Sequence, residues 1–102
     1  MCTGMVRLLA FIDIFVESSC MDNVIQALCK LDNLEELYEV TGEFDIVSLV
    51  SAADIEEFRD ILKNKIMKIH GVKSTVSSVV LMTHHGPRCI HELQQDKPNS
   101  TE

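Results

Sequence analysis

An α+β fold is predicted for this 102-residue chain by three observations. Four segments carry apolar residues in the patterns of β-strands, two carry them at helical spacing, and the segments follow one another in the order β-α-β-β-α-β. Two β-α-β units with right-handed crossovers form the split βαβ, or ferredoxin-like, sandwich. We therefore predict a four-stranded antiparallel sheet with two helices on one face.

The first half of the chain supplies one β-α-β unit. A long strand is predicted over residues 5–17, because its even-numbered positions are all apolar, while Leu9, Phe11 and Phe15 share the other face with charged residues. Ser19 is the expected N-cap of the first helix. The apolar stripe of that helix consists of Met21, Val24, Ile25, Leu28 and Cys29.

A β-hairpin is predicted at residues 34–52, and the rest of the fold is organised around it. The runs Leu34 to Thr41 and Ile46 to Ala52 read as strands, and the second has apolar groups on both faces, as a central strand does. Between them Gly42 can adopt a positive φ, and Asp45 carries a carboxylate near the tip. The hairpin thus presents a polar turn between two predicted strands.

The second half repeats the pattern. Asp54 and Glu57 form an expected capping box, three lysines close the helix, and Gly71 occupies the position of a left-handed stop. The apolar stripe of this helix is Ile55, Phe58, Leu62, Ile66 and Ile69. A last strand is predicted from Val72 to Thr83. We expect one domain at residues 1–83, folded from about residue 5, followed by a flexible tail at residues 84–102.

Composition and charge narrow the classes of function. The formal net charge is −7, which opposes the binding of nucleic acid by this chain alone. The apolar stretch Leu8 to Val16 contains Asp13 and is too short to cross a bilayer, and the N-terminus lacks the features of a signal peptide. The cysteines Cys2, Cys20, Cys29 and Cys89 form no CxxC pair, so we expect reduced thiols and a cytoplasmic location.

An exposed apolar surface follows from the predicted architecture. Both helices cover one face of the sheet, so the other face is left open and carries either Leu9, Phe11 and Phe15 or their even-numbered alternates. Large exposed apolar patches usually mark interfaces. We predict a homodimer formed through this face.

Two sequence pieces resemble a known family. The first is Thr41-Gly42-Glu43-Phe44-Asp45, the second is Gly71-Val72-Lys73-Ser74-Thr75 about 25 residues later, and the similarity extends over roughly residues 5–83. Together they resemble the effector-binding domain of the Lrp/AsnC regulators. A helix-turn-helix domain normally precedes this module in the family, whereas only a few residues precede Met5, so we expect a stand-alone version without direct contact to nucleic acid.

The resemblance implies a partner, an assembly and a site. It implies an amino acid or similar small effector, dimers that assemble further into rings, and an effector held between dimers, with a full-length Lrp/AsnC regulator as a possible partner. No cofactor and no membrane are expected. By position, the resemblance selects these candidate ligand-binding residues: Thr41, Gly42, Phe44, Asp45, Ser74, Thr75 and Ser77.

The chemistry of these residues fits an amino acid. Asp45 can accept from an ammonium, hydroxyls and backbone N–H groups near Gly42 can donate to a carboxylate, and Phe44 can form a pocket wall. Two plainer interpretations stay open: Gly42 and Asp45 are also common turn formers, and Ser and Thr are also compatible with an exposed edge strand.

Other functions are weaker alternatives. His84, His85, Cys89 and His91 carry donors that suit Zn or Cu, but Gly86 and Pro87 among them are typical of a loose tail, so we predict no metal site. No nucleophile with an adjacent base and no phosphate loop is present, so we expect no enzyme. A small ferredoxin-like enzyme, or an adaptor in mixed assemblies with longer relatives, remains as an alternative.

Overall fold

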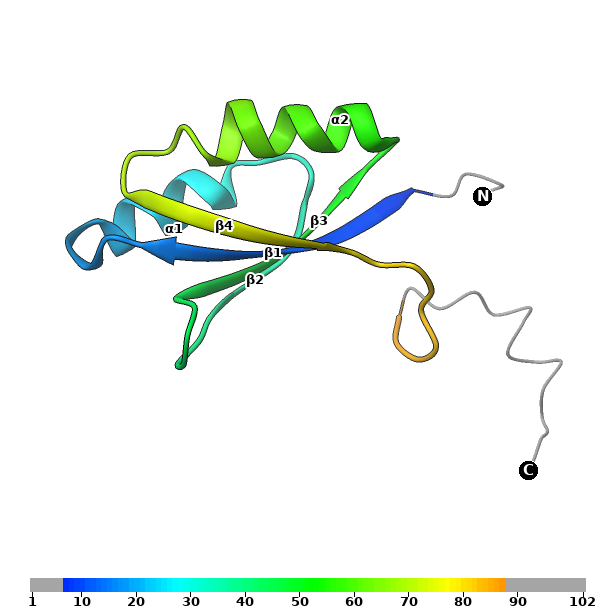
Figure 1. Ribbon diagram of the computed structural model, residues 1–102, viewed down its shortest axis with the longest axis horizontal. Coiled ribbons are helices and arrows are strands. Elements are labelled where there is room, and N and C mark those ends of the chain that lie inside the picture. The colour runs from blue at the N-terminus through cyan, green and yellow to red at the C-terminus, as the bar shows by residue number, and fades with distance from the viewer. Residues whose placement is uncertain (1–6, 88–102) are drawn as a thin grey trace, which may run out of the picture.

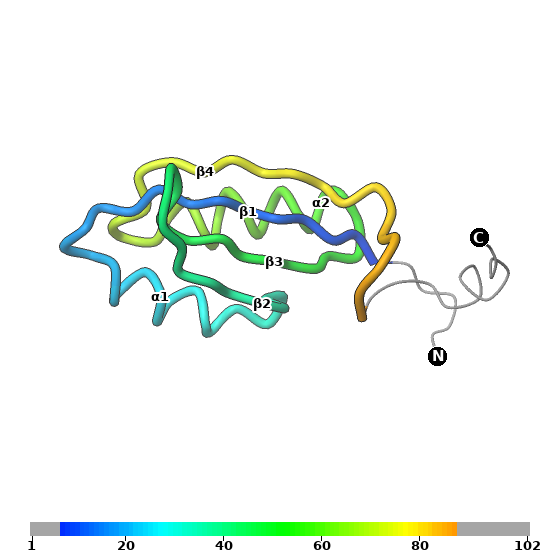
Figure 2. The backbone as a smooth tube through the Cα atoms, turned by 90° about the horizontal axis from the view of Figure 1, so that it is seen from below, coloured from blue at the N-terminus to red at the C-terminus, as the bar shows by residue number. Residues whose placement is uncertain are grey.

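A four-stranded antiparallel sheet with strand order β2-β3-β1-β4 forms one layer of the protein, as the computed structural model shows for residues 7–87. Its strands are β1 (Leu8–Val16), β2 (Leu34–Glu39), β3 (Ile46–Ala52) and β4 (Val72–Val79). The helices lie together on one side of the sheet (Figure 1). Figure 2, seen from below, shows the four strands side by side. The predicted ferredoxin-like sandwich is confirmed.

Strand β1 lies between β3 and β4 and sets the two faces of the sheet. Its even-numbered residues from Ala10 to Val16 are buried under the helices, and its odd-numbered residues Leu9, Phe11, Asp13 and Phe15 lie on the other face. Paired residues share a face, because directly opposite side chains in an antiparallel pair point the same way. Of the two alternatives that the sequence left open, the structure therefore places Leu9, Phe11 and Phe15 on the face away from the helices.

The first helix begins differently from the prediction. Residues Ser18–Cys20 form a 3₁₀ turn (η1), in which the Cys20 N–H donates to Glu17 O at 2.8 Å, and helix α1 spans Met21–Cys29. Cys20 is the N-cap, and no side chain caps the helix. The prediction of Ser19 as N-cap is therefore wrong, because the extra turn moves the start of the α-helix beyond it.

The second helix changes register halfway. Helix α2 (Ile55–Asp60) begins as predicted, since the Asp54 carboxylate accepts from Glu57 N at 2.9 Å. It continues as a π-helical segment, η2 (Ile61–Ile66). A π-helix bonds five residues apart, so Ile61 and Ile66 lie on the same face and both are fully buried. Ile55 of the predicted stripe is 50% exposed, and Leu62 is only half-buried, whereas Ile61, which the stripe omitted, is fully buried in the core.

Two strands end at least two residues earlier than predicted. β2 ends at Glu39 rather than Thr41, and β4 ends at Val79 rather than Thr83. In β4 the reason is the length of its partner, because Val79 already pairs with Ala10, and the Val80 N–H donates to Leu9 O at 2.8 Å near the start of β1. The chain beyond Val80 leaves the sheet.

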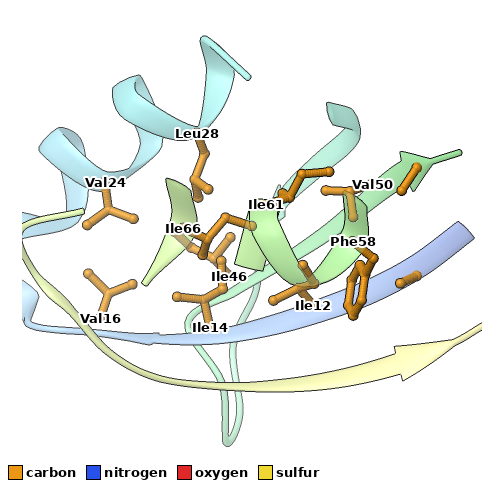
Figure 3. Packing of buried hydrophobic residues seen from close by; sticks show 12 residues of the cluster. Ile12, Ile14, Val16, Val24, Leu28, Ile46, Val50, Phe58, Ile61 and Ile66 are labelled. Carbon is orange, nitrogen blue, oxygen red and sulfur yellow. The ribbon is translucent and has the colours of Figure 1, made fainter. Parts of the chain in front are cut away.

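The hydrophobic core lies between the sheet and the helices. Ile12, Ile14 and Ile46 of the sheet meet Leu28 of α1 and Ile66 of η2, and all five side chains are fully buried (Figure 3). Ser48 is buried in the same layer, and its hydroxyl donates to Ile12 O at 3.0 Å, which satisfies its polar group. The helices and this core cover only one face of the sheet, so the opposite face is not covered by a helix of residues 7–87.

Candidate functional site

The turn between β2 and β3, residues 40–45, is attached to the end of β1. The Val40 N–H donates to Asp45 O at 3.0 Å and closes the turn, and Gly42 has a φ of 119°, which L side chains rarely adopt. The Asp45 N–H donates to Ile14 O at 3.1 Å, and the Asp45 carboxylate accepts from Val16 N at 2.8 Å. Asp45 thus holds the turn against β1 on both sides of Phe15.

An aromatic pair links this turn to the sheet. The rings of Phe44 and Phe15 have centroids 4.8 Å apart and an interplanar angle of 50°, and both side chains are half-buried. Phe15 lies on the face of the sheet away from the helices, which we call the open face. In the register of β1 and β4, Phe15 is opposite Ser74. Phe44, Phe15 and Ser74 therefore come together at one end of the open face.

The hydroxyls of Thr75 and Ser77, which were also predicted to bind the ligand, lie on the face of the sheet that the helices cover. Thr75 is opposite Ile14 and Ser77 is opposite Ile12, so both share the face that the helices cover. Thr75 is half-buried and Ser77 is exposed, whereas the remaining predicted residues Thr41 and Gly42 are exposed in the turn. One protomer therefore does not gather all seven predicted residues around a single cavity.

A groove that the sequence did not predict lies at the opposite end of the open face. It has a volume of about 480 Å³. It forms where residues 81–87, which we call the C-terminal segment, turn back below the sheet (Figure 1). The residues that line it are Leu9, Phe11, Glu36, Leu49, Val80, Met82, Thr83, His84, His85, Gly86 and Pro87. The signal in the sequence was the apolar run at residues 79–82 next to Gly86-Pro87.

The predicted tail and the weak metal candidates are only partly described. His84 and His85 line the groove, whereas Cys89 and His91 fall outside the described residues. Within residues 7–87, no group of three or more His, Cys, Asp or Glu side chains is arranged to hold a metal ion. In the same part of the chain, Cys20 and Cys29 are free thiols. The flexible tail stays a prediction for the residues beyond 87.

No helix in the described part of the chain has the length and apolar character needed to span a membrane.

Comparison with known proteins identifies the domain. The family model for the Lrp/AsnC ligand binding domain matches residues 9–87. The HTH-type transcriptional regulator FL11 of Pyrococcus abyssi is 36% identical over 77 residues, which are 76% of this chain and 50% of that protein. The chain thus spans about half the length of the curated regulators that it matches. Homocitrate synthase of Sulfurisphaera tokodaii is 32% identical over 75 residues, which make up 69% of this chain and only 16% of that enzyme.

A solved structure shows the same fold. The feast or famine regulatory protein from M. tuberculosis, complexed with L-methionine, has a TM-score of 0.70 and 30% sequence identity, and the match covers 83% of this chain and 56% of that chain. The β2–β3 turn, the open face and β4 all lie within the region that the family model matches. The chain belongs to the family of Lrp/AsnC ligand binding domains.

Proposed function

We propose that this chain is a cytoplasmic regulatory module that binds an amino acid and responds by changing its assembly or its choice of partner. The main support is the turn anchored by Asp45, which places Phe44 against Phe15 beside Ser74 at one end of the open face. A related regulator of the same fold was solved with L-methionine. In this role the chain needs neither an enzymatic activity nor a cofactor.

The chemistry at this end of the sheet suits an amino acid. The Phe15 and Phe44 rings offer an apolar wall for a side chain, the Ser74 hydroxyl offers a donor for the carboxylate, and Asp45 offers negative charge for the ammonium. One Asp45 oxygen already accepts from Val16 N. We therefore assign the ammonium to the other oxygen, Oδ1.

A complete site requires more than one subunit. Thr75 and Ser77 lie behind the sheet relative to the Phe15–Phe44 pair, so a site that uses all seven predicted residues must combine surfaces of different protomers. The open face supports such an assembly, because Phe11, Tyr38 and Val76 are 41%, 53% and 47% exposed on it. We propose a homodimer through the open face and a higher oligomer, such as a ring of dimers.

Effector binding between subunits would shift this assembly. A ligand that binds only the higher oligomer stabilises it by RT ln(1 + [L]/Kd), which is about 2.7 kcal/mol at a hundredfold excess over Kd. That amount changes an assembly equilibrium by about two orders of magnitude. The assembled state would in turn select a partner, and a full-length Lrp/AsnC regulator is the partner that we propose.

The test is a thermal-shift screen of the twenty amino acids, followed by light scattering on each that stabilises the protein. We expect an apolar amino acid such as L-methionine to raise Tm and increase the particle mass. Ser74→Ala is the matched variant, and Ser78→Ala, exposed further along the same face of β4, is its control. If none of the twenty changes either quantity, the sensor proposal is wrong, and an adaptor that joins full-length relatives without an effector takes its place.

A further inference from the structure

We propose that the C-terminal segment exchanges between two copies of this chain, so that the segment of each protomer covers the open face of its partner. The inference rests on the proposed function, because it takes the open face as the dimer interface. The C-terminal segment is the element that makes the contact, and its exchange links the two protomers.

The chain has a clear point of departure from its own sheet. The hydrogen bond from Val80 N to Leu9 O is 2.8 Å long and extends the pairing of β4 with β1 one residue past the end of β4. Leu81 follows directly and is 96% exposed, which is unusual for a large apolar side chain, and Met82 is 63% exposed. A change of direction at Leu81 would redirect the whole segment without disturbing the strand.

The groove beside Leu81 can accept the C-terminal segment of a second copy. Phe11 of β1 and Leu49 of β3 lie opposite each other on the open face, and Leu9 and Val80 extend the apolar floor. Phe11 is 41% exposed, so the segment in its present path leaves part of the floor in contact with water. Both the segment and its receptor thus expose apolar surface at the same end of the sheet.

A second copy of the chain is the occupant that matches both surfaces. A twofold interface needs a patch that complements itself, because a contact between one residue and a second residue of the partner is repeated with the two protomers interchanged. Here an apolar protrusion, Leu81 and Met82, adjoins an apolar groove around Phe11 on one chain. A twofold axis through this end of the open face places each protrusion against the partner's groove. Exchange of an identical element preserves the contact between segment and groove.

The experiment uses two full-length variants with opposite charges. Phe11→Glu places a carboxylate in the groove, and Met82→Lys places an ammonium on the segment; both positions are partly exposed, so the fold of each variant is checked by circular dichroism and Tm. Each variant alone should dimerise roughly a hundredfold more weakly than the wild type, because it sets a charge against an apolar surface. Dimer formation is measured by sedimentation, and the composition of dimers by native mass spectrometry.

The decisive sample is the equimolar mixture. With exchange, a heterodimer contains one unaltered contact and one contact between Glu at position 11 and Lys at position 82, so it should form roughly tenfold or more tightly than either homodimer. A Phe11→Glu/Met82→Lys double variant should also recover as a homodimer.

Two results would overturn the exchange and leave the dimer in place: no preference for the heterodimer in the mixture, or single variants that dimerise like the wild type. A monomeric wild type would instead contradict the open-face dimer of the proposed function, and the exchange with it.

Discussion

The Asp45 carboxylate accepts a hydrogen bond from the Val16 N–H at 2.8 Å, which joins the start of β3 to the end of β1. The residue that the sequence predicts as a ligand acceptor therefore has a structural contact as well. The two roles are separable, because a carboxylate has two oxygens and only Oδ2 faces Val16 N. This separation determines which substitutions test the site.

Asp45→Ala should lower the free energy of unfolding by about 1–3 kcal/mol, because it removes a charged acceptor and leaves a partly buried N–H without its partner. Asp45→Asn keeps an acceptor for Val16 N and should lose clearly less. Urea denaturation measures both values. Calorimetry with L-methionine then tests the charge: we expect Asp45→Asn to lose binding, and unchanged affinity would remove Asp45 from the proposed site.

The contact between Phe15 and Phe44 should appear as a coupling energy. In a double-mutant cycle with Phe15→Leu and Phe44→Leu, we expect a coupling of about 0.5–1.5 kcal/mol in the free energy of unfolding, as for other tilted aromatic pairs. The control cycle pairs Phe44 with Phe11, which lies four residues earlier on the same face of β1, roughly 13 Å along the strand. Additive losses in both cycles would contradict the contact.

The close approach of α1 to the start of β4 should make Gly71 irreplaceable. A Cβ at Gly71 would lie 2.3 Å from Cys20 Cβ, and the φ of 106° adds strain. Gly42 has a similar φ of 119° but open space around it, so Gly42→Ala carries the strain alone, about 1–2 kcal/mol. Gly71→Ala should destabilise by about 1–3 kcal/mol more. Equal losses in chemical denaturation would show that the backbone at Gly71 moves to relieve the contact.

The π-helical register should be visible in two adjacent substitutions. Ile61 is fully buried and Leu62 is half-buried, so Ile61→Ala should cost about 2–5 kcal/mol and Leu62→Ala clearly less. An α-helical continuation from Phe58 through Leu62 to Ile66, as the apolar stripe predicts, would reverse this order. The free energies of unfolding of the two variants therefore distinguish the two registers.

The turn and Phe44 of the candidate site were predictable, but the part that Phe15 plays there and the contacts between these residues were not. Gly42 and Asp45 were recognised by turn chemistry and by resemblance to the family, and the structure places both in the β2–β3 turn. The contact of Phe44 with Phe15 and the hydrogen bond from Val16 N join residues 29 positions apart. Nothing in either local segment encodes such a contact.

By itself, the sequence determined the element order, the alternation of β1 and the capped start of α2 at Asp54, because these depend on periodicity and on side chains a few residues apart. Only the tertiary structure decided the phase of η2, the end of β4 and the face on which each hydroxyl lies. Each of these depends on a partner distant in the chain: the core that takes Ile61, the start of β1, and the register that sets Ser74 beside Phe15 and Thr75 behind it. Local patterns specify which segments form strands and helices, and packing specifies which distant residues each of these segments contacts.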